Sequence, residues 1–429
     1  MNKILLTISS LLIFVSVVVK LYFISIEPIY ISNILGKTDI VAIVVSSIFL
    51  LGYSLKSIKD DTKSKYKYNV KIFFLFILTI IVLSISTIYN LNKKSLDWDA
   101  IALYDARAKF LTSGMSFSQM GMLSEFDDKN KYYYLLYPPF TSIIHQFWYK
   151  FNVNLPIGVL YSIFLILMVL ILGSLVIDYL GLFWTVLTVL LVVSNKDIFS
   201  ISIIEYTNLP FTLYLTSGIF LLLNGFVKNK RYIQILGFLF IAGSIWIRFL
   251  EPVWLAVVLA YIVATLFNKK IKQNMLCIII GISIILSQYI GWNYFQKIVA
   301  NTPQIFHINK FVIFESIWGL FTGSFLNILF FYLKSYGVLS IIYFTALIKI
   351  NKKEPNEFIF LRLIIIICLV MYFAGIYGIS FMFDWWREMS GSLARSSSYL
   401  IPISIFLIIS NIKYLLEKNI GSAKTIKYE

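Results

Sequence analysis

The sequence has few charged residues and almost no cysteine or histidine, and these shortages exclude several classes of protein. Only 14% of its 429 residues are charged, whereas 59% are hydrophobic, and the mean hydropathy is +0.84. These values are typical of a polytopic membrane protein and exclude an ordinary soluble domain. The two cysteines, Cys277 and Cys368, lie inside apolar runs and provide no disulfide framework. No Cys/His spacing indicates a zinc site, and we find no internal repeat or low-complexity tract.

The sequence is instead rich in long apolar runs. Twelve of them predict membrane-spanning helices, at residues 4–25, 39–55, 71–91, 157–180, 182–194, 210–227, 232–249, 252–267, 272–291, 324–348, 358–380 and 398–416. We therefore expect an all-α polytopic membrane protein with about 12 transmembrane helices in a single domain over residues 1–429. Exterior loops are expected at 92–156, 292–323 and 381–397, the first with juxtamembrane helices. No stretch remains for a separate soluble domain.

The net charge of +16 is explained by membrane topology. With the N-terminus inside, the predicted cytoplasmic segments hold 21 of the 37 basic residues and only 7 of the 21 acidic ones. Because basic residues favour the cytoplasmic side of a membrane, this bias predicts a multi-pass protein of the plasma membrane with both termini in the cytoplasm. Membrane lipids are the expected surroundings, and the charge indicates no nucleic-acid partner.

The most distinctive pattern lies in the first exterior segment. Asp97 and Asp99 place two carboxylates two residues apart, directly before a predicted short helix. Four residues fall on one stripe of this helix and predict that it lies along the membrane surface: Ile101, Tyr104, Ala108 and Leu111. Because a carboxylate at a membrane rim is costly to desolvate, the pair predicts a functional site. A solvated loop or a helix cap is the alternative for either acid, and it is the favoured one for Asp97.

A second acidic position comes at the start of a later span. Glu205 and Asn208 directly precede Pro210. We expect Glu205 either to contact an acceptor or a metal, or to be an interfacial acid, and Asn208 is a second candidate for the acceptor or metal contact. The oxygen ligands of Asp97, Asp99 and Glu205 suit Mg or Mn, so a divalent metal cofactor is left open.

Four cations at predicted exterior positions are candidates for binding a phosphate group. Arg248, at the end of a span, either binds phosphate or pairs with Glu251 three residues on. Arg387 and Arg395 flank the mouth of the last span, and at least one is expected to contact phosphate. Lys310 is a further candidate.

Other polar groups are expected to have structural roles. His145 and His307 are single histidines and are predicted to be packed side chains. Asp105 and Arg107 are predicted to form a solvated surface pair. Pro138 and Pro139 predict the start of a second short helix in the first exterior segment.

Four segments together resemble the GT-C glycosyltransferases, in particular the protein mannosyltransferase and lipid A aminoarabinose transferase types. The first joins Trp98-Asp99, the run DARAKF and the later YPPF. The others are EYTNLPFTLY, WIRFLEPVW and SLARSSSYLIP, and all are predicted to lie on the exterior face. In EYTNLPFTLY the chain departs from the family pattern, because Asn208 stands where the family has a second acid before the proline.

The resemblance implies a glycosyltransferase that uses a polyprenyl-phosphate sugar as donor. It implies an inverting single displacement at the exterior face, with Asp99 as the base and a glycan, lipid or protein as acceptor. Phosphate-binding cations are chemically suited to stabilise the departing lipid phosphate. Two alternatives are a transporter or flippase of a lipid-linked glycan and an O-antigen-type polymerase or ligase.

Overall fold

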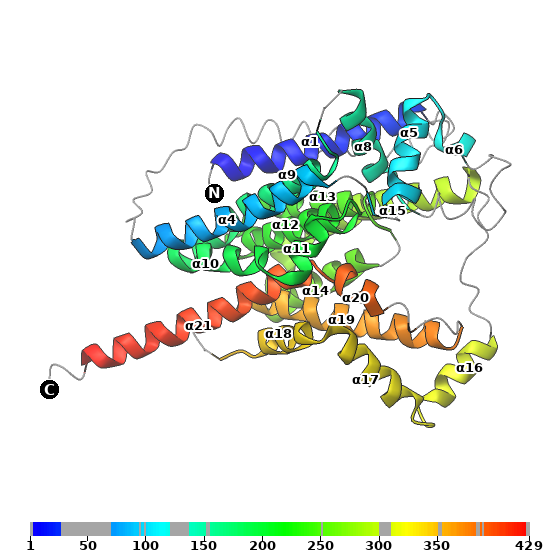
Figure 1. Cartoon of the computed structure of the whole chain (residues 1–429). Helices are drawn as coiled ribbons and strands as arrows, with labels where there is room; N and C mark the ends of the chain where they lie inside the picture. Colours follow the sequence, from blue (N-terminus) through cyan, green and yellow to red (C-terminus); the bar gives the residue numbers. More distant parts are fainter. Residues whose placement is uncertain are drawn as a thin grey trace. The chain divides into compact units, whose positions relative to one another are not determined.

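The chain is helical throughout the part that the structure describes. The computed structural model describes residues 3–26, 70–93, 96–97, 100–120, 137–151, 155–249, 252–299, 310–350, 354–382, 387 and 390–425, and all regular structure within these ranges is helical (Figure 1). The chain divides into two compact units. The first consists of Met1–Trp254 and Lys270–Thr302, and the second of Leu255–Lys269 and Pro303–Glu429.

Helices occupy every predicted span that falls within the described residues. The predicted span at 39–55 lies outside them. Five helices are long and apolar enough to cross a membrane, or up to seven if each of two sharply bent helix pairs is one span. Four shorter apolar helices accompany them. The prediction of a membrane-embedded helical protein is therefore supported, whereas the count of twelve spans stays a prediction.

The first unit contains most of the chain. Its helices are α1 (Lys3–Ile26), α4 (Val70–Asn92), η1 (Ala100–Asp105), α5 (Ala106–Thr112), α6 (Phe117–Met120), α8 (Phe140–Lys150), α9 (Gly158–Leu180), α10 (Leu182–Val193), α11 (Lys196–Ser202), α12 (Asn208–Val227), α13 (Arg231–Ile245) and α15 (Ile271–Val299).

The centre of this unit is the antiparallel pair α12 and α13. Helix α12 is almost completely buried inside the unit. Gly218 and Gly237 allow the two backbones to touch, because a Cβ atom on either glycine would lie within 2.9 Å of the carbonyl oxygen of the other. Small residues at such crossings permit close van der Waals packing where hydrophobic burial adds little. Helices α9 and α15 cover this pair on its sides.

The first surface helix differs from its prediction in register. It begins as a π-helix, η1, before it continues as α5. Because a π turn contains an extra residue, it rotates the residues before it away from the later stripe. Tyr104, Ala108 and Leu111 are buried within the protein, whereas Ile101 is 46% exposed. The predicted position of this helix along the membrane surface stays a prediction. The second surface helix, α8, begins directly after Pro139, as predicted.

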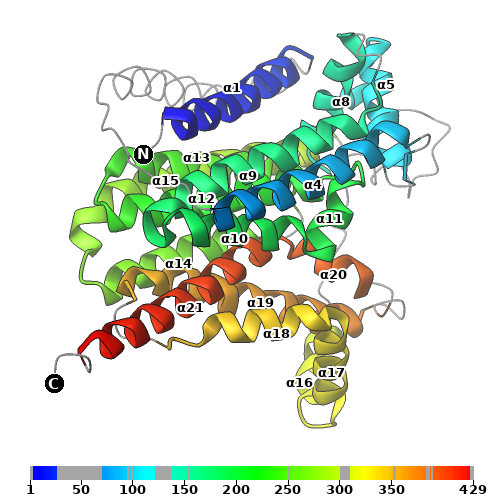
Figure 2. The ribbon, with the colours of Figure 1, turned by 60° about the vertical axis from the view of Figure 1, so that its left-hand side comes forward.

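The second unit contains α14 (Val253–Phe267), α16 (Lys310–Gly319), α17 (Ser324–Tyr336), α18 (Val338–Leu347), η2 (Asn356–Phe358), α19 (Ile359–Ser380), α20 (Ser390–Ser396) and α21 (Leu400–Thr425). Helix α18 lies along α21 (Figure 2). Helices α17 and α18 meet at Gly337 with a bend of 96°. The predicted span at 324–348 therefore consists of two helices joined by a sharp bend, and whether the pair crosses the membrane as one span stays a prediction.

Candidate functional site: a buried polar cluster in the first unit

The ammonium group of Lys93 joins two acids that were predicted from separate segments. Its Nζ donates to Asp97 Oδ2 at 2.7 Å and to Glu205 Oε2 at 2.8 Å, and also to the carbonyl oxygen of Ile203 at 2.8 Å. Lys93 directly follows α4, whereas Glu205 lies between α11 and α12. The fold therefore brings the first predicted exterior segment against the second.

The two carboxylates differ in their access to solvent. The Asp97 side chain is 43% exposed, whereas that of Glu205 is only 1% exposed. Burial raises the pKa of Glu205, although the hydrogen bond and charge of Lys93 act in the opposite direction. Burial alone would lower the pKa of Lys93, but its bonds to the two acids outweigh that effect and raise it. Lys93 is therefore a permanent cation at neutral pH, and Asp97 presents the carboxylate that solvent reaches.

Asn90, Gly158 and Glu205 meet behind this ion pair. The amide of Asn90 donates to Ser162 Oγ and to the carbonyl oxygen of Ser202, both at 2.9 Å. Asn90 Oδ1 and Glu205 Oε1 are buried and have no hydrogen-bond partner among the described residues. Both lie 3.1 Å from the point where a Cβ atom on Gly158 would stand. The glycine thus leaves room for two buried oxygens that a larger residue would displace.

Asp105 and Arg107 form part of the packed interior and not a solvated pair, so that prediction is wrong. They are only 2% and 0% exposed. Asp105 accepts a hydrogen bond from Tyr149 of α8 and pairs with Lys109 at 2.7 Å. Arg107 donates to the carbonyl oxygen of Tyr137 at 2.8 Å and stacks near Tyr104. These contacts fasten α8 and the Tyr-Pro-Pro segment to η1 and α5.

His145 and Tyr104 connect this surface layer to α9 and to the segment before α12. His145 is fully buried, as predicted for a packed side chain, and its Nε2 lies 3.0 Å from the hydroxyl of Tyr161 on α9. Burial lowers the pKa of His145 to about 4. Tyr104 lies 3.4 Å from Thr207 Oγ1, and its pKa is raised mainly by burial. The charge of Arg248 acts on Tyr104 in the opposite direction. Arg248 therefore belongs to the electrostatic surroundings of this cluster.

The remaining predicted residues of the first unit have different outcomes. Asp99 lies outside the described residues, as does Glu251, so the base assignment and the Arg248–Glu251 pairing stay predictions. Asn208 is 6% exposed and opens α12, three residues after Glu205. The side chain of Asp97 pairs with Lys93, and its predicted role as a helix cap stays a prediction, because residues 98–99 lie outside the described residues. Of the described predicted residues, Asp97 and Glu205 are brought together.

The other predicted cations belong to the second unit. Arg387 is exposed. Arg395, in α20, is half-buried and donates from Nη2 to Ser392 Oγ at 3.3 Å. Lys310 is the first residue of α16. His307 lies outside the described residues. Whether these cations face the acids of the first unit stays a prediction.

A metal site was left open on the basis of the sequence. The described residues contain no group of three or more His, Cys, Asp or Glu side chains placed to hold a metal ion. Because Asp99 lies outside those residues, the set Asp97, Asp99 and Glu205 stays untested as metal ligands.

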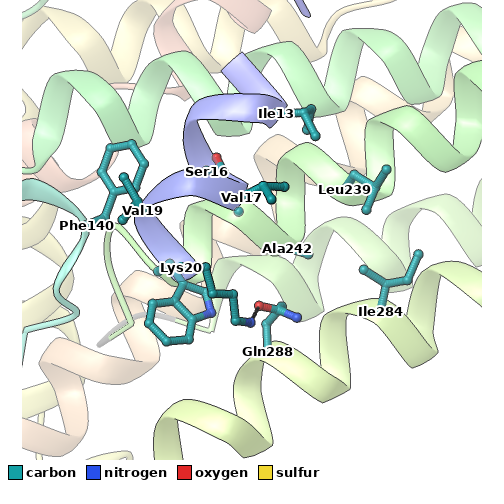
Figure 3. Close-up of a pocket in the computed structure, with 12 residues that line it drawn as sticks. Ile13, Ser16, Val17, Val19, Lys20, Phe140, Leu239, Ala242, Ile284 and Gln288 are labelled. Atoms are coloured by element: carbon teal, nitrogen blue, oxygen red, sulfur yellow. Dashed lines mark hydrogen bonds between the residues drawn. The ribbon is translucent and has the colours of Figure 1, made fainter. Parts of the chain in front are cut away.

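An apolar groove lies in the same unit, with a cation inside it (Figure 3). Helices α1, α13 and α15 line most of it, with Ile13, Val17, Leu239 and Ile284 as apolar walls. Lys20 of α1 is only 2% exposed, bonds to Gln288 of α15, and lies 4.5 Å from the ring centre of Trp246. A lysine within an apolar span is costly to bury, and here the Gln288 side chain and the Trp246 ring face its ammonium group.

Neither Lys93 nor Lys20 was predicted from the sequence as part of a site. Lys93 stands four residues before Asp97, which is the spacing of an ion pair on a helix, and this signal was available. Nothing in the sequence connects Lys93 with Glu205. Lys20 was visible as the single charge near the end of the first apolar run.

The cluster places a solvent-accessible carboxylate, Asp97, beside a cation that a buried acid, Glu205, also binds. A carboxylate in such a position can accept a proton from a hydroxyl group. No protein-family model, curated protein or solved structure matches this chain.

Proposed function

We propose that the chain is a membrane glycosyltransferase of the GT-C type, which moves a sugar from a polyprenyl-phosphate donor to an acceptor at the exterior face of the plasma membrane. The observation that carries the proposal is the meeting of Asp97 and Glu205 on Lys93. Two segments that resemble the family, far apart along the chain, contribute to one polar cluster. A site assembled from exterior loops requires that such segments lie next to each other, and this contact supports the proposal.

The proposed reaction is a single displacement with inversion. The acceptor hydroxyl oxygen attacks the anomeric carbon and transfers its proton to the carboxylate of Asp99. The bond between the anomeric carbon and the phosphate oxygen breaks, and its electron pair leaves with the polyprenyl phosphate. Asp97 and Glu205, held by Lys93, orient the segment that carries Asp99 or contact the acceptor. Arg248, Arg387, Arg395 and Lys310 are proposed to bind the departing phosphate.

The groove around Lys20 supports a lipid-linked substrate. Its walls are apolar, and its buried ammonium lies between Gln288 and Trp246. An alkyl chain favours such walls, because burial removes apolar surface from water. The proposal places the donor's isoprenoid part in contact with this groove.

The proposed topology follows from the charge distribution. We propose about twelve spans, cytoplasmic termini and an exterior site. The ends of α4, α9, α11 and α12 that meet near Lys93 are all ends that the charge bias assigns to the exterior. The partners are a polyprenyl-phosphate sugar, membrane lipids, and a glycan, lipid or protein acceptor.

The test is transfer activity of the purified protein with a panel of polyprenyl-phosphate sugars. Asp99→Asn should reduce the rate by about 10²- to 10⁴-fold, the usual contribution of a general base, with an unchanged melting temperature. The matched control is Asp178→Asn, because Asp178 pairs with Lys228 near the opposite ends of α9 and α12. Equal turnover of wild type and Asp99→Asn would overturn the assignment. Assays with and without EDTA decide whether Mg or Mn takes part.

The bent helices favour a second candidate function, a transporter or flippase of a lipid-linked glycan. Two helix pairs are bent at short breaks, α10–α11 by 65° and α17–α18 by 96°, and interrupted helices commonly form substrate sites in carriers. The test is movement of a lipid-linked sugar between leaflets of proteoliposomes without any acceptor. Movement without transfer would favour this candidate over the enzyme.

A further inference from the structure

The second unit contains a cavity that the proposed glycosyl transfer does not use. It has a volume of about 410 Å³ and lies where the ends of α14 and α18 meet the start of α19. The residues that line it are Phe267, Asn268, Lys349, Asn356, Ile359 and Arg362. All three helix ends are ends that the charge bias assigns to the cytoplasmic side.

Arg362 supplies a buried cation to this cavity. Its residue is only 8% exposed, although it belongs to an apolar helix. Its Nη2 donates to Glu354 Oε1 at 2.8 Å and, more weakly, to the carbonyl oxygen of Ile348 at 3.5 Å. Its Nε is buried and has no hydrogen-bond partner among the described residues. Arg362 lines the cavity, and because a guanidinium carries five N–H donors it is suited to an additional oxygen acceptor there.

Lys349 supplies a second cation at the more open side. It is exposed, and its Nζ donates to Asn356 Oδ1 at 3.2 Å. Together with Glu354, which pairs with Arg362, these groups carry two positive charges and one negative charge. The set therefore has an excess of one positive charge, which matches a ligand with a single negative charge.

A phosphodiester carries one negative charge, and its oxygens accept hydrogen bonds from Arg and Lys. Phe267 and Ile359 add apolar surface beside the cations, which suits the start of an acyl chain. Basic pockets between membrane helices on the cytoplasmic side are a known type of site for anionic lipid head groups.

We propose that this cavity binds the phosphodiester head group of an anionic membrane lipid. Lys349 and the guanidinium group of Arg362 contact the phosphate oxygens, and Glu354 holds the guanidinium in place. The proposed lipid site does not depend on glycosyl transfer, so its test can succeed or fail whatever the outcome of the transfer assay.

The experiment measures lipid binding to the purified full-length protein in detergent by native mass spectrometry. The probes are phosphatidylglycerol, phosphatidylcholine and inorganic phosphate. Phosphatidylglycerol should bind, whereas phosphatidylcholine, which has the same phosphodiester but no net charge, should bind at least about tenfold more weakly. Lys349→Gln should weaken phosphatidylglycerol binding about fivefold, the usual effect of one basic residue near a lipid surface.

The matched control is Lys334→Gln, because Lys334 is an exposed lysine of the same unit that does not line the cavity. It should leave binding unchanged. Lys349 is exposed, so its substitution tests the site without removing the buried partner of Glu354. Three outcomes would each overturn the proposal. The two lipids could bind equally, the two substitutions could have equal effects, or inorganic phosphate at the same concentration could displace the lipid.

Discussion

Lys93 and Glu205 form an ion pair with an Nζ–Oε2 distance of 2.8 Å, although 112 positions separate them along the chain. The Glu205 side chain is 1% exposed and that of Lys93 is 13% exposed. A buried ion pair contributes little net stability, because desolvation offsets the attraction, but loss of one partner leaves an uncompensated charge. The pair therefore fixes the position of the segment before α12 against the end of α4.

Lys93→Met should destabilise the protein, because it leaves the buried Glu205 without its cation. We expect a loss of roughly 3 kcal/mol, as for other buried pairs that lose one partner. The measurement is thermal unfolding in detergent. Lys228→Met is the control and should have little effect, because the side chain of its partner, Asp178, is 45% exposed. The double variant Lys93→Met/Glu205→Gln should recover much of the loss, and additive losses would contradict the assignment.

The same variant should change the dependence of stability on pH. Burial raises the pKa of Glu205 above its ordinary 4.5, and Lys93 opposes that rise. Without Lys93 the pKa of Glu205 rises further, so the folded protein takes up a proton at a higher pH than the unfolded chain does. Its stability is then greatest below about 4.5 and falls as pH increases through the raised pKa. Lys93→Met should therefore lose less stability at pH 5 than at pH 8, and an equal loss at both would contradict this account.

Gly158→Ala should displace the two buried oxygens, of Asn90 and Glu205, that the glycine leaves room for. The new Cβ atom would lie 3.1 Å from both Asn90 Oδ1 and Glu205 Oε1, which is closer than ordinary contact. We expect a loss of about 1–3 kcal/mol, typical of overpacking, in thermal unfolding. Gly173→Ala in the same helix is the matched control, since its Cβ would meet Val189 at an ordinary 3.6 Å. It should be neutral or stabilising, because alanine favours helix more than glycine does.

Helix positions could be predicted from the sequence because each apolar run long enough to bury its backbone hydrogen bonds forms a helix. The limits of α4 and α9 differ from the predicted spans by one residue at most. The bend between α17 and α18 was not predicted, since the apolar pattern continues across Gly337. The pattern shows that residues are apolar but not that the chain changes direction.

The site was predicted only in part, for a physical reason. Acids close to the ends of spans stand out in an apolar sequence, which indicated Asp97 and Glu205. The partner that joins them comes from another helix, and burial depends on packing that a local pattern does not contain. For the same reason Asp105 and Arg107, charged and close to a loop, were predicted to be solvated although both are buried.

His145 should make the protein less stable in acid. Burial lowers its pKa from 6.5 to about 4, with smaller and opposing effects of Asp105 and Arg107. Between these values the unfolded chain binds a proton that the folded protein does not, so stability is full above about 6.5 and falls as pH decreases. The loss should reach about 3 kcal/mol near pH 4. His145→Gln should show a smaller loss of melting temperature between pH 7 and pH 4 than wild type. Identical profiles for His145→Gln and wild type would exclude His145 as the cause.

Because of the π turn in η1, we expect Leu111 and Ile101 to contribute unequally to stability, although both belong to the stripe predicted from the sequence. Leu111 is 3% exposed and Ile101 is 46% exposed, because the extra residue of the π turn rotates Ile101 away from the packed side. Leu111→Ala should therefore cost about 2–5 kcal/mol, as for other buried leucines. Ile101→Ala should cost less than about 1 kcal/mol, since most of the side chain that it removes makes no packing contact within the unit. Thermal unfolding of both variants in the same detergent is the measurement. Equal losses would mean that the two residues share one buried face, as a regular α-helix over this segment would require.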